Sequence, residues 1–431
     1  MRTSQANSIS DLKKIARDYL PRIAFDFIEG GVEDEICLRR NHDAFDRYQL
    51  LPQCLIDVSQ RDQSTDIFGR TYSCPFGIAP TGGAGMWRKG ADLMLAQAAA
   101  KANVPFILSC ASISSVESIV DIAGKNVWFQ SYATHDTNIS EALIRRAQMS
   151  EVETLVVTVD VPVTGKRERN LRNGFSRPLK LRPSIVLDGI LHPRWLARYL
   201  AAGATMPNME NWTSFVPPNA TADEILAFYG SQTPSATQTW AKIAQIRARW
   251  NGRLVLKGIL NPMDAVKAFE VGADGIIVSN HGGRQLDLAP SPVDVLPLIR
   301  AMLGNEKTVM LDSGIQRGTN ILKALALGAD FTFVGRATLY GVIAGGREGA
   351  ARALDILKRE VDINMGLLGR TSTLDVGQDI LMRRNDYAPD PATAITANMP
   401  SGDRPAESRT AKEFDSAALR SLGISNGAIS T

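Results

Sequence analysis

The sequence is poor in the residues that form metal sites and covalent cross-links. It holds four cysteines in 431 residues, and no two of them have the Cys-x-x-Cys spacing of a zinc or redox site. It also holds only four histidines. The sequence therefore indicates neither a metal site nor a disulfide framework, and a reducing cytosol is the expected compartment.

The chain also lacks a strong charge bias and a long apolar run. Its formal net charge at pH 7 is only +3, which is too small to indicate a nucleic-acid partner. No uninterrupted apolar run is long enough to span a bilayer, and the polar first eleven residues argue against a secretory signal. We therefore expect a cytoplasmic protein. Its apolar content of 44% and charged content of 22% are ordinary for a globular protein.

Short apolar runs alternate with helical patterns from residue 75 onward. The expected strands are residues 76–80, 106–111, 127–132, 155–160, 254–258, 275–280, 309–313 and 331–335. Eight strands that alternate with helices predict an α/β fold, a (β/α)8 TIM barrel, and the pattern at residues 10–30 predicts a helical segment before it. A doubly wound sheet is the alternative, but it usually has fewer strands, and an early Gly-x-Gly-x-x-Gly fingerprint is missing.

One connection, between the fourth and fifth expected strands, is too long for a structureless loop in a compact domain. We expect an insertion at residues 177–239. Its first part, 177–200, carries five basic residues and one acidic residue, a net of +4, interleaved with aromatic and aliphatic ones. Such a segment could lie on an anionic membrane surface, or pack on the barrel as a lid or an oligomer contact. We assign residues 1–385 to the barrel and expect a disordered tail at 386–431, which is rich in Pro, Ala, Ser, Thr and Asp.

The stretch SNHGGRQLD at residues 279–287 follows an expected buried strand. It places His281 and Arg284 at the carboxyl end of that strand, where ligands and catalytic groups gather in α/β folds. The two residues could also do no more than cap the strand in a turn. The other strand ends favour a site, because polar groups follow most of them as well.

Two kinds of groups stand at these other strand ends. Polar side chains and exposed backbone end the first five strands, at Pro80, Thr81, Gly82, Ser109, Gln130, Tyr132, Thr158, Asp160 and Lys257. Gly-rich turns with adjacent arginines follow the last two strands and contain Asp312, Gly314, Arg317, Gly335 and Arg336. Backbone N–H groups, a helix N-terminus and a guanidinium form a phosphate site, which in barrels commonly follows strands seven and eight.

A phosphate site beside a central cation suits flavin mononucleotide (FMN). Lys257 would supply the positive charge that the N1–C2=O region of the flavin needs when reduced. With a flavin as electron acceptor, His281 would be the base and Asp160 its partner, because a carboxylate raises the pKa of a neighbouring imidazole. Arg284 and Arg167 could hold a substrate carboxylate in bidentate fashion. The predicted reaction is therefore the oxidation of a 2-hydroxy acid.

From about residue 12 to 384 the chain resembles the FMN-dependent α-hydroxy-acid dehydrogenase and oxidase family. The most specific match is the stretch 279–287. The mandelate-oxidising members are the most similar, through FIEGG at 27–31, PTG at 80–82, KRER at 166–169 and VLDGILHPRW at 186–195. In the dehydrogenases among those members the corresponding insertion contacts the membrane. The resemblance therefore implies a peripheral position on the inner face of the cell membrane, and we also expect a homo-oligomer, a tetramer.

The resemblance implies the same roles for the residues at the strand ends. Tyr132 would donate a hydrogen bond to the substrate, beside the base and the two arginines. The isoalloxazine ring would be held by the backbone near Thr81 and by Ser109, Gln130, Thr158, Lys257 and Ser279. The ribityl-phosphate arm would be held by Asp312 and Gly314, and the phosphate by Gly335 and Arg336.

Two positions depart from the family pattern. Phe27 stands where the family usually has a tyrosine that hydrogen-bonds the substrate carboxylate, and the loss of one neutral hydrogen bond costs roughly 0.5–1.5 kcal/mol. We therefore expect an altered substrate choice or a raised KM. Gln316 stands where the family usually has an arginine beside the phosphate, with Arg317 next to it. Either Arg336 carries the phosphate charge alone or Arg317 joins it.

Three hypotheses follow from the sequence. The first is a dehydrogenase of aromatic (S)-2-hydroxy acids such as mandelate that passes electrons to a quinone-type acceptor. The second is an L-lactate or other 2-hydroxy-acid dehydrogenase, or an oxidase that uses oxygen. The third is a weakened FMN-binding barrel with a regulatory role, which the departures at Phe27 and Gln316 motivate.

Overall fold

The computed structural model describes residues 1–176 and 182–383. The expected tail at 386–431 lies outside these residues, as do Arg177 and Lys180 of the basic segment. None of the helices in the described ranges combines the length and the apolarity that crossing a bilayer requires.

Eight parallel strands close into a barrel in the order β10-β11-β4-β5-β6-β7-β8-β9. The strands are β4 (Phe76–Ile78), β5 (Phe106–Ser109), β6 (Val127–Ser131), β7 (Thr154–Thr158), β8 (Arg253–Ile259), β9 (Gly275–Val278), β10 (Thr308–Leu311) and β11 (Phe331–Val334). The predicted (β/α)8 barrel is confirmed. Seven of the eight predicted strands run one or two residues past the observed end, because the chain leaves the sheet there to form the loops of the site.

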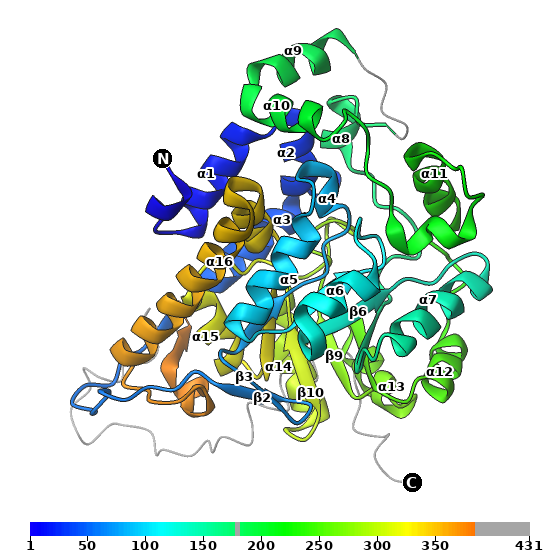
Figure 1. Cartoon of the computed structure of the whole chain (residues 1–431). Coiled ribbons are helices and arrows are strands. Elements are labelled where there is room, and N and C mark those ends of the chain that lie inside the picture. The colour runs from blue at the N-terminus through cyan, green and yellow to red at the C-terminus, as the bar shows by residue number, and fades with distance from the viewer. Residues whose placement is uncertain (177–181, 384–431) are drawn as a thin grey trace, which may run out of the picture. The chain divides into compact units, whose positions relative to one another are not determined.

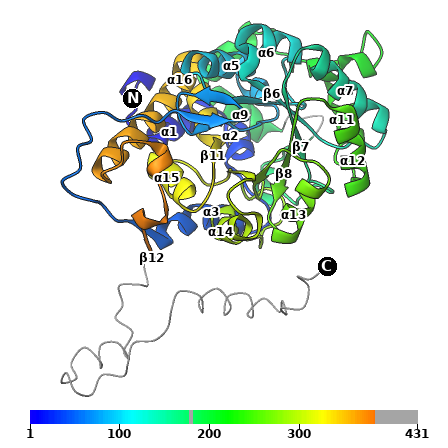
Figure 2. The same cartoon turned by 90° about the horizontal axis from the view of Figure 1, so that it is seen from below.

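Helices cover the outside of the barrel, as Figure 2 shows. They are α5 (Ala91–Ala102), α6 (Val116–Ala123), α7 (Thr137–Met149), α12 (Trp240–Arg249), α13 (Pro262–Glu270), α14 (Pro292–Leu303), α15 (Gly318–Ala326) and α16 (Arg336–Leu367). Polar N-cap side chains begin several of them: Ser115, Asp136, Thr239 and Asn261 each accept a bond from a backbone N–H of the first turn. Gly346 has a left-handed backbone (φ +64°) and divides α16 into two helical stretches.

Large apolar side chains fill the inside of the barrel. Trp128, Phe331, Phe333 and Met310 pack there with smaller residues of the other strands. The antiparallel pair β2 (Thr65–Ile67) and β3 (Arg70–Tyr72) joins this cluster, and the indole N–H of Trp128 lies 3.4 Å from the hydroxyl of Tyr72. The barrel is therefore packed solid, and a ligand site has to lie at its rim.

Further helices come from the segments before and between the barrel units. They are α1 (Ile9–Tyr19), α2 (Arg22–Glu29), α3 (Ile36–Asp43), α4 (Ala84–Trp87), α8 (Glu168–Arg172), α9 (Pro183–Leu191), α10 (Pro193–Ala201) and α11 (Ala222–Gln232). The short strands β1 (Tyr48–Leu50) and β12 (Leu381–Arg383) pair with each other. Short 3₁₀ helices span Thr3–Gln5, Ala44–Arg47, Gly124–Asn126, Glu210–Phe215, Thr373–Asp375 and Gln378–Ile380.

The long connection after β7 contains α8 to α11. Figure 1 shows α9 and α10 at the top of the view, above α2 and α8. The carboxylate of Asp188, in α9, accepts a hydrogen bond of 2.6 Å from the backbone N–H of Arg22 at the start of α2. This hydrogen bond links the connection to the N-terminal helical segment, which precedes the barrel in the sequence.

Candidate functional site

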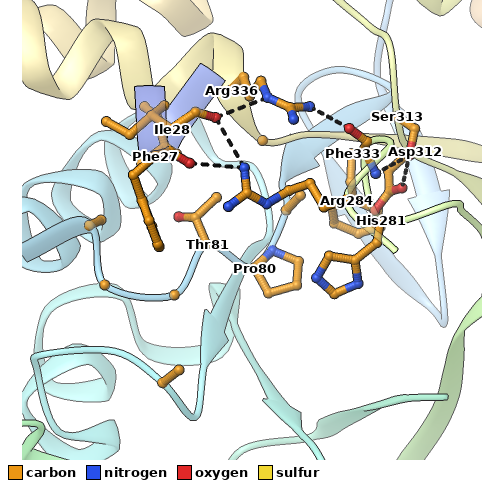
Figure 3. Close-up of a pocket in the computed structure, with 18 of the residues that line it drawn as sticks. Phe27, Ile28, Pro80, Thr81, His281, Arg284, Asp312, Ser313, Phe333 and Arg336 are labelled. Atoms are coloured by element: carbon orange, nitrogen blue, oxygen red, sulfur yellow. Dashed lines mark hydrogen bonds between the residues drawn. The ribbon is translucent and has the colours of Figure 1, made fainter. Parts of the chain in front are cut away.

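A cavity lies at the carboxyl ends of the barrel strands, and residues from both the N-terminal segment and the strand ends line it. Figure 3 shows part of this cavity, with Arg284 and Arg336 reaching toward Ile28 on one side and His281 on the other. Predicted site residues that line it are Phe27, Pro80, Thr81, Gly82, Tyr132, Thr158, Arg167, Lys257, His281, Arg284, Asp312, Gly314, Gly335 and Arg336. The structure therefore brings together groups as far apart in sequence as Phe27 and Arg336.

The loop after β9 has an unusual backbone. His281, Gly282 and Gly283 are all left-handed, with φ of +58°, +66° and +72°. A side chain at Gly283 would also place its Cβ only 2.7 Å from the backbone nitrogen of Leu38. A histidine in this conformation is strained and persists only where its surroundings fix it. Ser279 helps to fix it, since its hydroxyl accepts a 3.1 Å bond from the His281 N–H.

His281 and Asp160 form a buried pair, with Nδ1 3.1 Å from Oδ1. Gly258, with φ of +106°, makes room for the pair, because a Cβ there would lie 2.5 Å from the carboxyl carbon of Asp160. The Nε2 atom of His281 is 3.5 Å from the hydroxyl of Tyr132, at the outer limit of a hydrogen bond. The pair to Asp160 therefore orients the imidazole and leaves Nε2 for a ligand.

Asp160 raises the pKa of His281, as predicted, but the net pKa of His281 is lowered. Burial lowers this pKa by more than the neighbouring Asp160 raises it, and Lys257 and Arg167 lower it further. For Asp160, burial acts to raise the pKa, but His281 and Lys257 outweigh it, so the net pKa is lowered. The imidazole is thus neutral and the carboxylate charged near neutral pH, which is the state in which a histidine can accept a proton.

Lys257 is a buried cation at the centre of the rim. Its ammonium lies 3.1 Å from the Asp312 carboxylate and donates to the Ser279 hydroxyl at 3.0 Å. Ser109, Gln130 and Thr158 form a hydrogen-bonded row beside it, with both links 3.0 Å long. Thr158 lines the cavity. Neither Ser109 nor Gln130 is among the residues that line it.

Three arginines, Arg167, Arg284 and Arg336, line the same cavity. Arg284 donates from Nη1 to the carbonyl groups of Phe27 (2.9 Å) and Gly30 (2.7 Å). Arg336 donates to the carbonyl groups of Ile28 and Gly282. Burial lowers the pKa of Arg284, and the other two arginines lower it further. Because a guanidinium stays charged, the cluster would stabilise an anion that enters the cavity.

The loops after β10 and β11 form the other end of the cavity. Gly314 is left-handed (φ +82°), and a Cβ there would meet the carbonyl oxygen of Asn41 at 2.1 Å. Gln316 lines the cavity. The structure does not bring Arg317 to it: the guanidinium is 3.2 Å from the carboxylate of Glu360, and the Arg317 side chain is half exposed. Among the described residues at this end, Arg336 is the arginine that lines the cavity.

The residues present fit FMN. A glycine at position 82 keeps the rim open, since a Cβ there would lie 3.1 Å from that of Ala111. Lys257 would supply the positive charge that a reduced flavin needs. Left-handed glycine backbone and Arg336 follow β10 and β11, where barrels bind phosphate.

Sequence reasoning missed the apolar part of the cavity. Met86, Trp87, Met209, Leu226 and Tyr229 line it and come from α4, from α11 and from the loop between α10 and α11. None of them stands directly at a strand end, so their position along the chain gives no signal of a site. The Phe27 ring lies 5.2 Å from that of Trp87 and 5.0 Å from that of Phe175.

Comparison with known proteins decides the family. A family model described as FMN-dependent dehydrogenase matches residues 16–383. The chain belongs to the FMN-dependent α-hydroxy-acid dehydrogenase family. Like other members of this family it is an enzyme that oxidises a 2-hydroxy acid with FMN, as predicted. When bound, FMN accepts two electrons from the hydroxy acid.

Similar members of the FMN-dependent family act on different acids. The chain is 40% identical to (S)-mandelate dehydrogenase of Pseudomonas putida over 375 residues, which cover 87% of this chain and 93% of that relative. It is 39% identical to a putative L-lactate dehydrogenase of Mycobacterium tuberculosis, over 86% of this chain and 87% of that relative. It is 36% identical to an L-lactate dehydrogenase of Xanthobacter autotrophicus, over 88% of this chain and 96% of that relative.

Solved structures of the family superpose well on this chain. A structure described as the monotopic membrane protein (S)-mandelate dehydrogenase has a TM-score of 0.84 and 38% identity to this chain. The superposition covers 88% of this chain and 100% of the chain in that structure. A mandelate oxidase variant in complex with (S)-mandelic acid has a TM-score of 0.72 and 34% identity, and covers 88% and 98%.

Proposed function

We propose that the enzyme oxidises an aromatic (S)-2-hydroxy acid such as mandelate to the 2-oxo acid and passes the electrons to a quinone-type acceptor. The observation that carries the substrate class is the apolar side of the cavity. Phe27, Trp87 and Tyr229 line it together with Arg284, so an aryl group would find apolar surface while its carboxylate meets a guanidinium.

In this proposal His281 is the base. Its neutral Nε2 accepts a proton from the substrate, and the charged Asp160 stabilises the imidazolium that results. Arg284 and Arg167 hold the substrate carboxylate. Arg284 keeps donors for this purpose, because the bonds that it makes to protein carbonyl groups all come from Nη1. Tyr132 donates a hydrogen bond to the substrate beside His281.

The cofactor would be held by the residues of the strand ends. Ser109 and Gln130 act from behind the cavity, through the row that ends at Thr158. The residues that would contact the isoalloxazine ring are Pro80, Thr81, Gly82, Thr158 and Lys257, and Ser279 would act through its hydrogen bond with Lys257. The residues that would contact the ribityl-phosphate arm are Asp312, Gly314, Gly335 and Arg336, without Arg317.

A second candidate is an L-lactate dehydrogenase or an oxidase. The L-lactate dehydrogenases at 39% and 36% identity and the mandelate oxidase structure at 34% favour it. The two candidates differ in the group on the substrate carbon and in the acceptor, whereas His281 and the arginines serve both in the same way.

Two half-reactions distinguish the candidates. The holoenzyme is mixed without oxygen with (S)-mandelate, L-lactate, glycolate and longer 2-hydroxy acids, and the loss of flavin absorbance is followed. We expect the highest kcat/KM with (S)-mandelate; a preference for lactate would contradict the aromatic assignment. The reduced enzyme is then mixed with oxygen or with a quinone. We expect the quinone to react faster, and faster reaction with oxygen would indicate an oxidase.

We further propose that the insertion, residues 177–239, contacts an anionic membrane surface at the inner face of the cell membrane. Its described helices α9 and α10 expose Val186, Leu187, Ile190, Leu191 and Leu200. Arg194 and Arg198 lie on α10, and Arg182 immediately precedes α9. Sedimentation with anionic phospholipid vesicles should carry the enzyme down, and neutral vesicles should carry less. Equal recovery in the supernatant with both would contradict the proposal. The homo-tetramer remains a prediction.

A further inference from the structure

A second cavity of about 370 Å³ lies between the loop after β4 and the helix α10. This volume is in the range of sites for small organic ligands. Met86 and Trp87 of the loop after β4 and Trp195 and Tyr199 of α10 line it, together with apolar side chains of α1, α5 and the chain after α10. The rings of Trp195 and Tyr199 are stacked, 5.1 Å apart and within 6° of parallel. The cavity therefore offers flat apolar surface to a planar ligand.

The charged side chains that line this second cavity are all basic. Arg88, Lys89 and Arg198 line it, and none of the described residues that line it is acidic. Arg88 is 9% exposed and has no carboxylate partner in the described chain. Its Nη1 donates to the carbonyl group of Ile343, but its buried Nε has no hydrogen-bond partner among these residues. A ligand with carbonyl oxygens, or with a negative charge, would match these donors.

The second cavity adjoins the active site and the proposed membrane surface. Met86 and Trp87 line both cavities, so two side chains form a common wall. On its other side stand Trp195, Arg198 and Tyr199 of α10, the helix that exposes Leu200. A ligand here would thus lie between the flavin site and a lipid surface.

We propose that the second cavity binds the quinone to which the enzyme passes its electrons. The quinone ring packs against the Trp195–Tyr199 stack, and its carbonyl oxygens accept hydrogen bonds from Arg88 or Arg198. The overall reaction balances: the hydroxy acid loses two electrons and two protons to become the 2-oxo acid, and the quinone gains the same two electrons and two protons to become the quinol. This inference rests on the proposed quinone acceptor. The test below distinguishes a wrong binding site from a wrong acceptor.

The test fills the second cavity without touching the first. Ala202, at the end of α10, lines the second cavity only, and Ala202→Trp puts a ring into it. Ala197→Trp is the matched control, because Ala197 is an exposed alanine of α10 that is not among the lining residues. Both holoenzymes are assayed in solution with a short-chain ubiquinone, so that membrane attachment plays no part.

For Ala202→Trp we expect kcat/KM for the quinone to fall roughly tenfold or more, because the added ring occupies the space of the ligand. The rate at which the hydroxy acid bleaches the flavin should stay unchanged, which also shows that the variant folds and binds FMN. Calorimetric titration of the oxidised holoenzyme with the quinone should show the same weakening. Ala197→Trp should behave as the wild type in all three measurements.

Three other results would overturn the inference or its basis. Unchanged quinone kinetics in Ala202→Trp would place the quinone elsewhere while leaving it the acceptor. Slower bleaching by the hydroxy acid would make the second cavity a passage for substrate. Failure of the quinone to reoxidise the wild-type enzyme, with oxygen succeeding, would instead contradict the proposed acceptor itself.

Discussion

The active-site cavity has two sides that are built in different ways. The polar floor, which we define as Asp160, Lys257, His281 and Asp312, comes from the carboxyl ends of four successive barrel strands and is internally paired. The apolar wall, defined as Phe27, Trp87, Leu226 and Tyr229, comes from helices outside the eight barrel units and from a connection between them. The proposed chemistry belongs to the floor and the proposed substrate choice to the wall, so the wall can differ between relatives that share one reaction.

The largest effect is expected when the proposed base, His281 of the polar floor, is replaced. We choose His281→Asn, because asparagine tolerates the left-handed backbone at this position better than alanine. Flavin bleaching by every 2-hydroxy acid should slow by roughly 10²- to 10⁴-fold, the usual contribution of a general base. The variant should remain yellow. Retained bleaching would remove His281 from this role.

A smaller effect is expected from the arginine that stands between the floor and the wall. Arg284→Lys keeps the charge but loses the fork that reaches the substrate, and a hydrogen bond to a charged group contributes about 1.5–3 kcal/mol, or roughly 10- to 150-fold in kcat/KM. The loss should be similar for aromatic and aliphatic acids. Arg172→Lys, on an exposed arginine of α8, is the control. A loss confined to aromatic acids would show that Arg284 acts in substrate choice, like the residues of the apolar wall.

The floor also predicts a pH dependence. His281 must be neutral to accept a proton, and burial lowers its pKa below the ordinary value of about 6.5. The bleaching rate should therefore be constant above this pKa and fall as the pH drops through it, with a midpoint on the acid side of pH 6.5. In Asp160→Asn the midpoint should move to still lower pH, since Asp160 raises the pKa of His281. A midpoint above about pH 6.5 would show that the pair with Asp160 outweighs burial.

The smallest effect belongs to the wall. Phe27→Tyr adds a hydroxyl at the cavity, and one neutral hydrogen bond is equivalent to roughly two- to tenfold in kcat/KM. We expect the gain with lactate and glycolate to exceed that with mandelate, because the aryl group already contacts the wall. Phe228→Tyr, on α11 but away from the cavity, should change neither. Equal gains for all acids would mean that residue 27 has no part in selectivity.

The floor could be predicted from the sequence because its signals are local. A short apolar run followed by Ser279 and His281 identifies a strand and the group that it presents, and strand order then places Asp160 and Lys257 near by. The net pKa of His281 could not be predicted in the same way. A neighbouring carboxylate is visible in the sequence, whereas the extent of burial follows only from packing.

The wall and the phosphate end show where local reasoning stops. Trp87 and Tyr229 reach the cavity through the packing of helices that carry no strand-end signal. At the phosphate end, Gln316 and Arg317 are adjacent in the chain, yet one lines the cavity and the other pairs with Glu360 on α16. The partner of Arg317 is remote in sequence, so neighbouring positions alone could not decide between the two.

The bonds from Arg284 to the α2 segment end on main-chain oxygens, at Phe27 and Gly30. Main-chain oxygens are present whatever the side chain, so a substitution at residue 27 leaves these anchors in place. Evolution can therefore exchange the aromatic ring at this position in a single step without first finding a compensating mutation. If residue 27 takes part in substrate choice as proposed, that choice could change there while the bonds from Arg284 to the α2 segment stay in place.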